Sequence, residues 1–105
     1  MMHPITDKAE VAIDFPDKAY MGGFGRDSGF EARADADGMM IKLVRSSGEK
    51  REVEVHLHHF LFAGILDDLA QSVAAREPID DTHRLPLLEA AQKLAAALAR
   101  GSSSG

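Results

Sequence analysis

The chain of 105 residues contains no cysteine, and it has no long apolar run. Without cysteine, disulfide bridges, thiolate zinc sites and a cysteine nucleophile are all excluded. This absence suits a reducing compartment, so we expect a cytoplasmic protein. No run approaches the roughly 20 apolar residues that a membrane-spanning helix needs. Residues 1–7 lack the basic and apolar regions of a secretory signal. We therefore expect no membrane association.

No segment carries a large charge of one sign. The net charge of −5 is spread along the chain, and an acidic surface repels phosphate backbones at long range. Six basic residues fall between positions 26 and 59, but acidic residues outnumber them there. No aromatic side chain occupies the outward strand positions among them, as a surface that stacks nucleic-acid bases would need. Nucleic acid is therefore not the expected partner.

No glycine loop for phosphate binding is found. Neither Gly-Lys-Ser nor Gly-Lys-Thr occurs, which excludes a P-loop. The Gly-Phe-Gly run at residues 23–25 has weak similarity to a dinucleotide-binding loop. However, Ser28 stands where that loop needs glycine, and a strand rather than a helix should follow. We interpret residues 16–28 as a flexible connection and expect no cofactor.

No group of residues has the pattern of a catalytic site. Asp67 and Asp68 are adjacent on a predicted helix, so their side chains point about 100° apart and cannot converge on one bond. Ser28 beside Asp27 lacks the Gly-x-Ser-x-Gly elbow of a hydrolase. We therefore expect a protein that is not an enzyme, and we assign no catalytic residue.

Three histidines near the middle of the chain are the closest approach to a metal site. His56 and His58 share one face of a predicted strand, and a third ligand could come from His59 or from residues 80–83. The His-Glu-x-x-His spacing of a helical zinc site is missing. We interpret the histidines as a solvent-facing group and expect no metal site.

The clearest positive signal is a change of hydrophobic period. Apolar residues alternate with polar ones in segments 30–36, 39–44 and 53–57, which is typical of half-buried strands. The period then lengthens to between three and four, which indicates an amphipathic helix from His59 to Arg76. A second helix is expected to start at Pro86, because proline suits the first helical position.

These elements predict an α+β fold in two layers. An antiparallel meander of three to four strands is followed by two C-terminal helices packed on one face. Residues 1–9 are expected to be loosely ordered, residues 10–100 to form a single domain with a short strand at 11–15, and residues 101–105 to be a flexible tail. The predicted core consists of Phe30, Ile41, Leu43, Val53, Val55, Ile65, Leu66, Leu69, Val73, Leu87, Leu94 and Leu98.

Two turn signals predict the registers of the meander. The Asp-Gly pair at 37–38 suits a two-residue type I′ turn, which places Ala34 opposite Ile41. A three-residue Ser-Gly-Glu loop keeps the apolar residues of the last two strands on one face, and it places Lys42 opposite Glu54.

The chain has more apolar residues than one inward face per element requires. Such a surplus is typical of association, so we predict a small protein-interaction module that forms a homodimer or docks a protein partner. The predicted interaction surface comprises Met40, Val44, Phe60, Leu61, Ala96 and Ala97. Two alternatives stay open. Residues 10–25 could cover this surface, or the outer sheet face could serve a nucleic-acid-binding or regulatory role.

Overall fold

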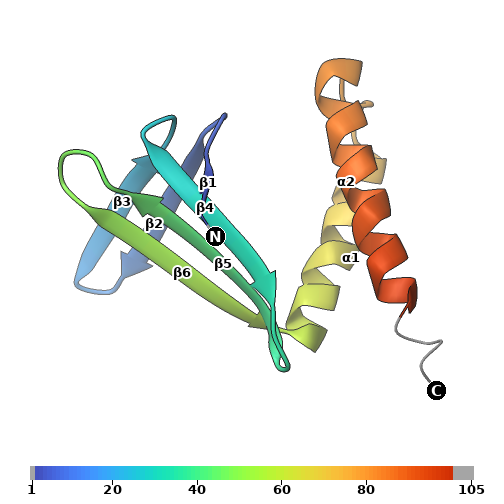
Figure 1. The fold of residues 1–105 in the computed structure, drawn as a ribbon, viewed down its shortest axis with the longest axis horizontal. Coiled ribbons are helices and arrows are strands. Elements are labelled where there is room, and N and C mark those ends of the chain that lie inside the picture. The colour runs from blue at the N-terminus through green and yellow to red at the C-terminus, as the bar shows by residue number, and fades with distance from the viewer. Residues whose placement is uncertain (1, 101–105) are drawn as a thin grey trace. The chain divides into compact units, whose positions relative to one another are not determined.

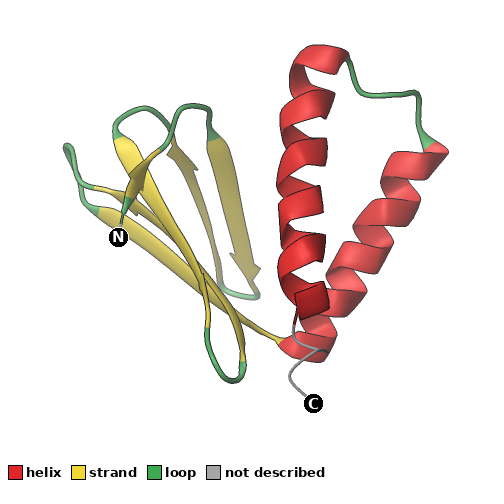
Figure 2. Cartoon of the chain, turned by 45° about the vertical axis from the view of Figure 1, so that its right-hand side comes forward, coloured by secondary structure: helices red, strands yellow, loops and turns green. Residues whose placement is uncertain are grey.

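The structure is a computed structural model that describes residues 2–100. The predicted α+β class is confirmed, since six antiparallel strands in two sheets precede two helices within the described residues (Figures 1 and 2). The chain divides into two compact units, residues 1–67 and 68–105. The single domain over residues 10–100 and the packing of the helices on one sheet face stay predictions. The flexible tail predicted at 101–105 lies outside the described residues.

The larger sheet has the strand order β1-β4-β5-β6. Its strands are β1 (His3–Pro4), β4 (Ser28–Ala34), β5 (Gly38–Arg45) and β6 (Arg51–His58). The last three are the meander that the alternating apolar residues predict.

The N-terminal residues belong to this sheet, so the expectation that residues 1–9 are loosely ordered is wrong for the part that pairs. His3 lies opposite Phe30, and their rings are 5.3 Å apart. The Ile5 N–H donates a hydrogen bond of 3.0 Å to the Ser28 carbonyl, and Ile5 is buried. A single apolar side chain and a short backbone pairing therefore order a segment that has no periodic pattern of its own.

The smaller sheet is a hairpin of β2 (Ala9–Phe15) and β3 (Lys18–Phe24). The strand predicted at residues 11–15 is confirmed as part of β2, but residues 16–28 are not a flexible connection. Phe15 lies opposite Lys18, so a Pro-Asp pair forms the turn, and proline favours the second position of such a turn. The sequence did not predict β3 because β3 contains Gly22, and glycine is depleted in strands. A Cβ there would lie 3.3 Å from Nη1 of Arg51.

The two hairpins of the meander differ in how well their registers were predicted. In β5–β6, Lys42 lies opposite Glu54 and Ile41 opposite Val55, as predicted. In β4–β5, Ile41 lies opposite Ala32, so the predicted pairing with Ala34 is wrong by two residues.

The β4–β5 turn is formed by Ala36 and Asp37 rather than by the Asp-Gly pair. The Asp35 carboxylate accepts hydrogen bonds from the backbone N–H groups of Asp37 and Gly38, both at 2.9 Å. The Asp35 N–H in turn donates to the Gly38 carbonyl at 2.9 Å. Neither turn residue has a positive φ, so the predicted type I′ turn is not formed.

The buried hydrophobic residues among the described ones are Ile5, Phe24 and Met40. Met40 was predicted to point outward, yet it is only 4% exposed. It lies on β5, directly opposite Arg33 of β4 and His56 of β6. The predicted core is wrong in that none of its twelve residues is classed as buried, and Ile41 is 37% exposed. The alternation predicted which side chains share a face, but not how far each face is covered.

The helices are α1 (His59–Ala75) and α2 (Asp81–Ala99), and neither contains a buried residue. The bounds predicted for α1 are confirmed, whereas α2 begins earlier than Pro86. The Asp80 carbonyl accepts the N–H groups of His83 and Arg84 at 3.0 and 2.7 Å, which starts the helix. Pro86 then lies inside the helix, where it removes one backbone donor. Within residues 2–100, no helix combines the length and the apolar character needed to cross a membrane.

Candidate interaction surface

The start of α1 displays the most exposed large hydrophobic side chain of the described residues. Phe60 is 95% exposed, and its neighbour Leu61 is 57% exposed. No residue separates β6 from α1, because the strand ends at His58 and the helix begins at the next residue. The position of this aromatic ring is therefore set by the sheet and not by a loop.

A histidine ties the first turn of α1 to the β4–β5 turn. The His59 ring lies with Nε2 at 3.1 Å from the Ala36 carbonyl oxygen, to which its N–H donates. His56 contacts the same turn, since its Nε2 lies 3.1 Å from a carboxylate oxygen of Asp35. The helix start is thus held by one hydrogen bond from His59, next to a contact from the end of β6, and Phe60 is the residue that follows.

The electrostatics of this turn centre on Asp35. The backbone N–H groups of Asp37 and Gly38, followed by the His56 ring, lower the pKa of Asp35 below its ordinary value of 3.8. Each of these donors favours the ionised carboxylate. Asp35 is therefore a negative charge that organises the turn and orients one histidine.

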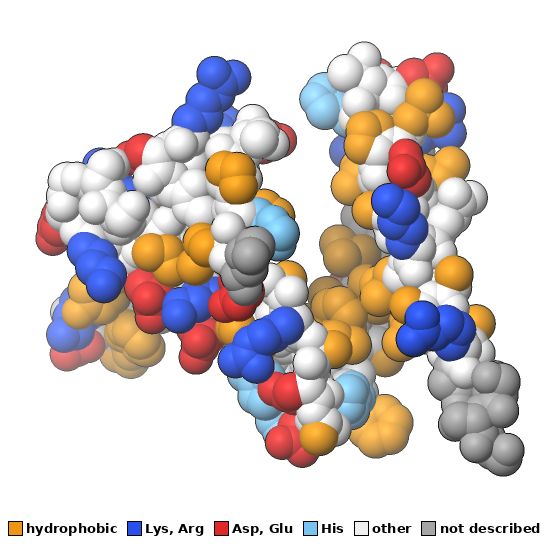
Figure 3. Space-filling model, viewed as in Figure 1, with side chains coloured by type: hydrophobic (Ala, Val, Ile, Leu, Met, Phe, Trp, Pro, Cys, Tyr) orange, Lys and Arg blue, Asp and Glu red, His pale blue; other side chains and the backbone are white. Residues whose placement is uncertain are grey.

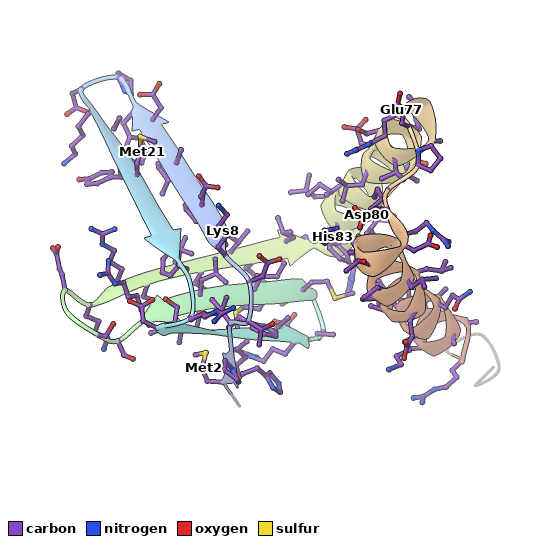
Figure 4. All side chains as sticks on the ribbon, turned by 90° about the horizontal axis from the view of Figure 1, so that it is seen from above. Met2, Lys8, Met21, Glu77, Asp80 and His83 are labelled. Carbon is purple, nitrogen blue, oxygen red and sulfur yellow. The ribbon has the colours of Figure 1, made fainter. Side chains whose placement is uncertain are left out.

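The histidines do not converge on a common point. The His56 and His58 rings lie with centroids 5.0 Å apart, while His59 bonds a backbone carbonyl. Asp80 and His83 pair with each other at 2.8 Å at the start of α2 (Figure 4). No group of three or more potential metal ligands occurs among residues 2–100. The expectation that the protein has no metal site stays a prediction.

The members of the predicted interaction surface differ in exposure. Met40 is buried, so it does not belong to an exposed surface, and Val44 is half-buried opposite Glu52. Phe60 and Leu61 are adjacent and exposed. Ala96 and Ala97 are exposed on α2, in the second compact unit. Without Met40, the interaction surface stays a prediction.

An apolar cleft lies between the β2–β3 hairpin and the start of β6, and the sequence did not reveal it. Its volume is about 520 Å³, a size within the common range for ligand pockets. Its apolar lining residues are Val11, Ile13, Phe15, Tyr20, Met21, Phe24 and Val53. Met21 projects from β3 and is 82% exposed (Figure 4). The apolar residues within the glycine-rich stretch were the signal that could have found this cleft.

Two arginines at this end of the larger sheet face carboxylates. Arg51 lies 3.9 Å from Glu49, and Arg45 lies 3.2 Å from Asp27. The hydroxyl group of Ser47, at 2.8 Å, is the main cause that lowers the pKa of Asp27. Because Arg51, which lines the cleft, faces a carboxylate, the cleft offers apolar contact more than a site for an anion.

The outer edge of β6 has no neighbouring strand among the described residues, since β6 ends the strand order of the larger sheet (Figure 1). An open edge presents unpaired backbone N–H and carbonyl groups that can join another strand. Hydrophobic side chains also lie at the surface of the strands and of both helices (Figure 3).

Comparison with known protein families, with curated protein sequences and with solved structures finds no match to the chain.

Proposed function

We propose that this chain is a small, non-enzymatic protein-interaction module that self-associates through the apolar surface around Phe60. The observation that carries the proposal is a phenylalanine that is 95% exposed on a helix turn held by a hydrogen bond from His59. A buried aromatic side chain contributes a large contact area, and a rigid position reduces the entropy lost on binding. Leu61, at 57% exposure, extends the apolar surface.

The row of charges across the sheet does not favour the nucleic-acid alternative. Glu31 lies opposite Lys42, which lies opposite Glu54, so two acidic residues flank one basic residue. Lys42 also lies 3.8 Å from Glu52. Phosphate binding needs unpaired cations, and base stacking needs aromatic side chains on the same face. At Lys42 this face supplies surrounding carboxylates and not an unpaired cation, which opposes the binding of a phosphate backbone there.

Sedimentation equilibrium of the wild type and of the double variant Phe60→Ser, Leu61→Ser tests the proposal. We expect a wild-type dimer at high micromolar concentration. Truncation of an apolar side chain at the centre of an interface commonly costs more than about 1 kcal/mol of binding free energy. The dissociation constant of the variant dimer should therefore rise at least about tenfold.

Met21→Ser is a matched control, because it removes another exposed apolar side chain from the first compact unit. It should leave the association constant of the wild type unchanged. A wild type that stays monomeric throughout the concentration series would contradict the proposal. Equal losses in the control and the double variant would show that association does not depend on the start of α1.

A further inference from the structure

The sequence of β6 is symmetric about Val55 in the chemistry of its side chains. Moving outward from Val55, the first pair of residues is Glu54 and His56. The second pair is Val53 and Leu57, and the third is Glu52 and His58. Acidic residues thus stand on one side of the centre, imidazoles stand at the matching positions on the other side, and apolar residues match apolar residues.

This symmetry has a defined consequence for two copies of β6 placed side by side. In an antiparallel pair related by a two-fold axis through Val55, each residue faces its mirror position in the other copy. Glu54 then faces His56 of the second copy. The Glu54 carboxylate thus meets an imidazole, whose Nε2 contacts Asp35 of its own copy, and not another carboxylate. Complementary side chains across strands favour pairing.

Other two-fold registers lose this complementarity. With the axis at Val53, Glu52 would face Glu54 of the second copy, and with the axis at Glu54, that residue would face itself. With the axis at His56, the two imidazoles would face each other. Like charges directly opposite each other destabilise a strand pair. The register centred on Val55 also uses nearly the whole strand, Arg51–His58.

The edge that this pairing needs is open. β6 has β5 as its only neighbour in the larger sheet as far as the structure describes the chain. The other long strand of this sheet with a free side, β4, is partly covered by β1 through His3 and Pro4. At 41% exposure, the Val55 side chain is accessible at the proposed axis.

We infer that β6 pairs with β6 of a second copy of this chain, antiparallel and centred on Val55, so that two four-stranded sheets join into one. This inference rests on the proposed self-association, and it adds a second contact, the edge of β6, to the surface around Phe60. The open backbone groups of both edges become satisfied in the pair. The apolar residues Val53, Val55 and Leu57 then continue from one sheet into the other on one face.

Disulfide trapping tests the register directly, because the wild type contains no cysteine. Opposed residues of antiparallel strands have Cα atoms about 4.5–5.5 Å apart, which suits a disulfide bond. Under mild oxidation, Val55→Cys should therefore form a covalent dimer. Val53→Cys alone should not, because the two copies of residue 53 would be about 13 Å apart in this register.

A mixture of Val53→Cys and Leu57→Cys provides the decisive control, since these positions face each other only in the proposed register. The mixture should form a heterodimer, whereas each variant alone stays uncrosslinked. Circular dichroism confirms that each variant is folded, and sedimentation of the reduced proteins measures association separately from crosslinking.

The outcomes distinguish the two proposals. Covalent dimers of Val55→Cys together with the mixed heterodimer would support the inference. A reduced protein that dimerises while Val55→Cys crosslinks no faster than Val53→Cys would overturn the β6 interface and leave self-association standing. A wild type and variants that are all monomeric would overturn both. Self-crosslinking of Leu57→Cys that is faster than that of Val55→Cys would overturn the register.

Discussion

Gly38 and Gly48 lie at the two turns of the meander, but each is used for a different property of glycine. Gly48, in the β5–β6 turn, has a φ of +62°, which side-chain-bearing residues rarely adopt. Gly38, beside the β4–β5 turn, has no positive φ. A Cβ built on it would instead collide with the Leu57 carbonyl oxygen, and it would lie 2.7 Å from Cα of His58. One glycine provides backbone freedom, and the other provides space.

The difference explains why the Asp-Gly pair at residues 37–38 misled the register prediction. That pair normally indicates a turn with positive φ at both positions. Here Asp35 forms the turn from one step earlier, by accepting two backbone N–H groups. Gly38 becomes the first residue of β5, where a missing side chain lets β6 approach. An Asp-Gly pair therefore indicates a type I′ turn only where the glycine is not required instead for the close approach of a neighbouring strand.

The largest loss of unfolding free energy is expected from Gly38→Ala. The new methyl group meets backbone atoms of β6, which cannot rotate away as a side chain can, so the strands must separate locally. Overpacking of this kind costs about 1–3 kcal/mol or more of unfolding free energy. Urea denaturation measures it. Gly25→Ala is the matched control, because a Cβ there meets no atom within 4 Å. Equal stability of the two variants would show that β6 does not approach Gly38 closely.

A smaller loss is expected from Gly48→Ala. A Cβ there has room, since Nη2 of Arg45 would lie 3.7 Å from it. The cost is therefore conformational, about 1 kcal/mol for an L-residue held at positive φ. Gly48→Asn should lose less stability than the alanine variant, because asparagine tolerates this conformation better. Denaturation curves of the two variants check the order, and an alanine variant as stable as the wild type would contradict the strained turn.

The smallest change in unfolding free energy at neutral pH is expected from Asp35→Asn. Asparagine keeps an oxygen that can accept the turn N–H groups but lacks the charge that faces His56. The pKa of Asp35 is lowered in the folded protein, so its ionised form adds stability above the unfolded pKa. That stability is lost as the pH falls through the lowered folded pKa. Below pH 3.8, the wild type should thus lose stability more steeply than the variant.

Urea denaturation over a series of pH values measures this slope. Parallel pH profiles for the wild type and Asp35→Asn would exclude a role for the charge. Asp35→Ala, which removes the acceptor as well, should be the less stable variant at neutral pH, because two turn N–H groups lose their partner.

The sequence predicts the part of the fold that depends on local alternation. The β5–β6 register follows from alternation together with the three-residue Ser-Gly-Glu loop, because a shift by one residue would exchange Lys42 with Ile41 between the two faces. A shift by two residues keeps every side chain on its face. Alternation therefore cannot distinguish Ala32 from Ala34 as the partner of Ile41, and the Asp35 hydrogen bonds decide between them.

The candidate site was predictable to a similar extent. Phe60 was recognised because it falls off the apolar stripe of its helix, and that requires only the period of the pattern. Met40 is buried, and its neighbours Arg33 and His56 lie opposite it only after the strands pair, so its burial does not follow from its own segment. The apolar cleft at the β2–β3 hairpin requires a strand that its glycines concealed. Features that arise from pairing between distant segments were thus missed.

The direct passage from β6 to α1 makes the chain sensitive to insertions at a single bond. The strand ends at His58 and the helix begins at His59, so no loop residue is present to absorb an added amino acid. One inserted residue within the first turn of the helix would rotate the following helix positions by about 100° relative to the sheet. Phe60 would then project in a new direction while every strand pairing stayed intact. The length of this junction, and not only its composition, fixes where the exposed aromatic ring points.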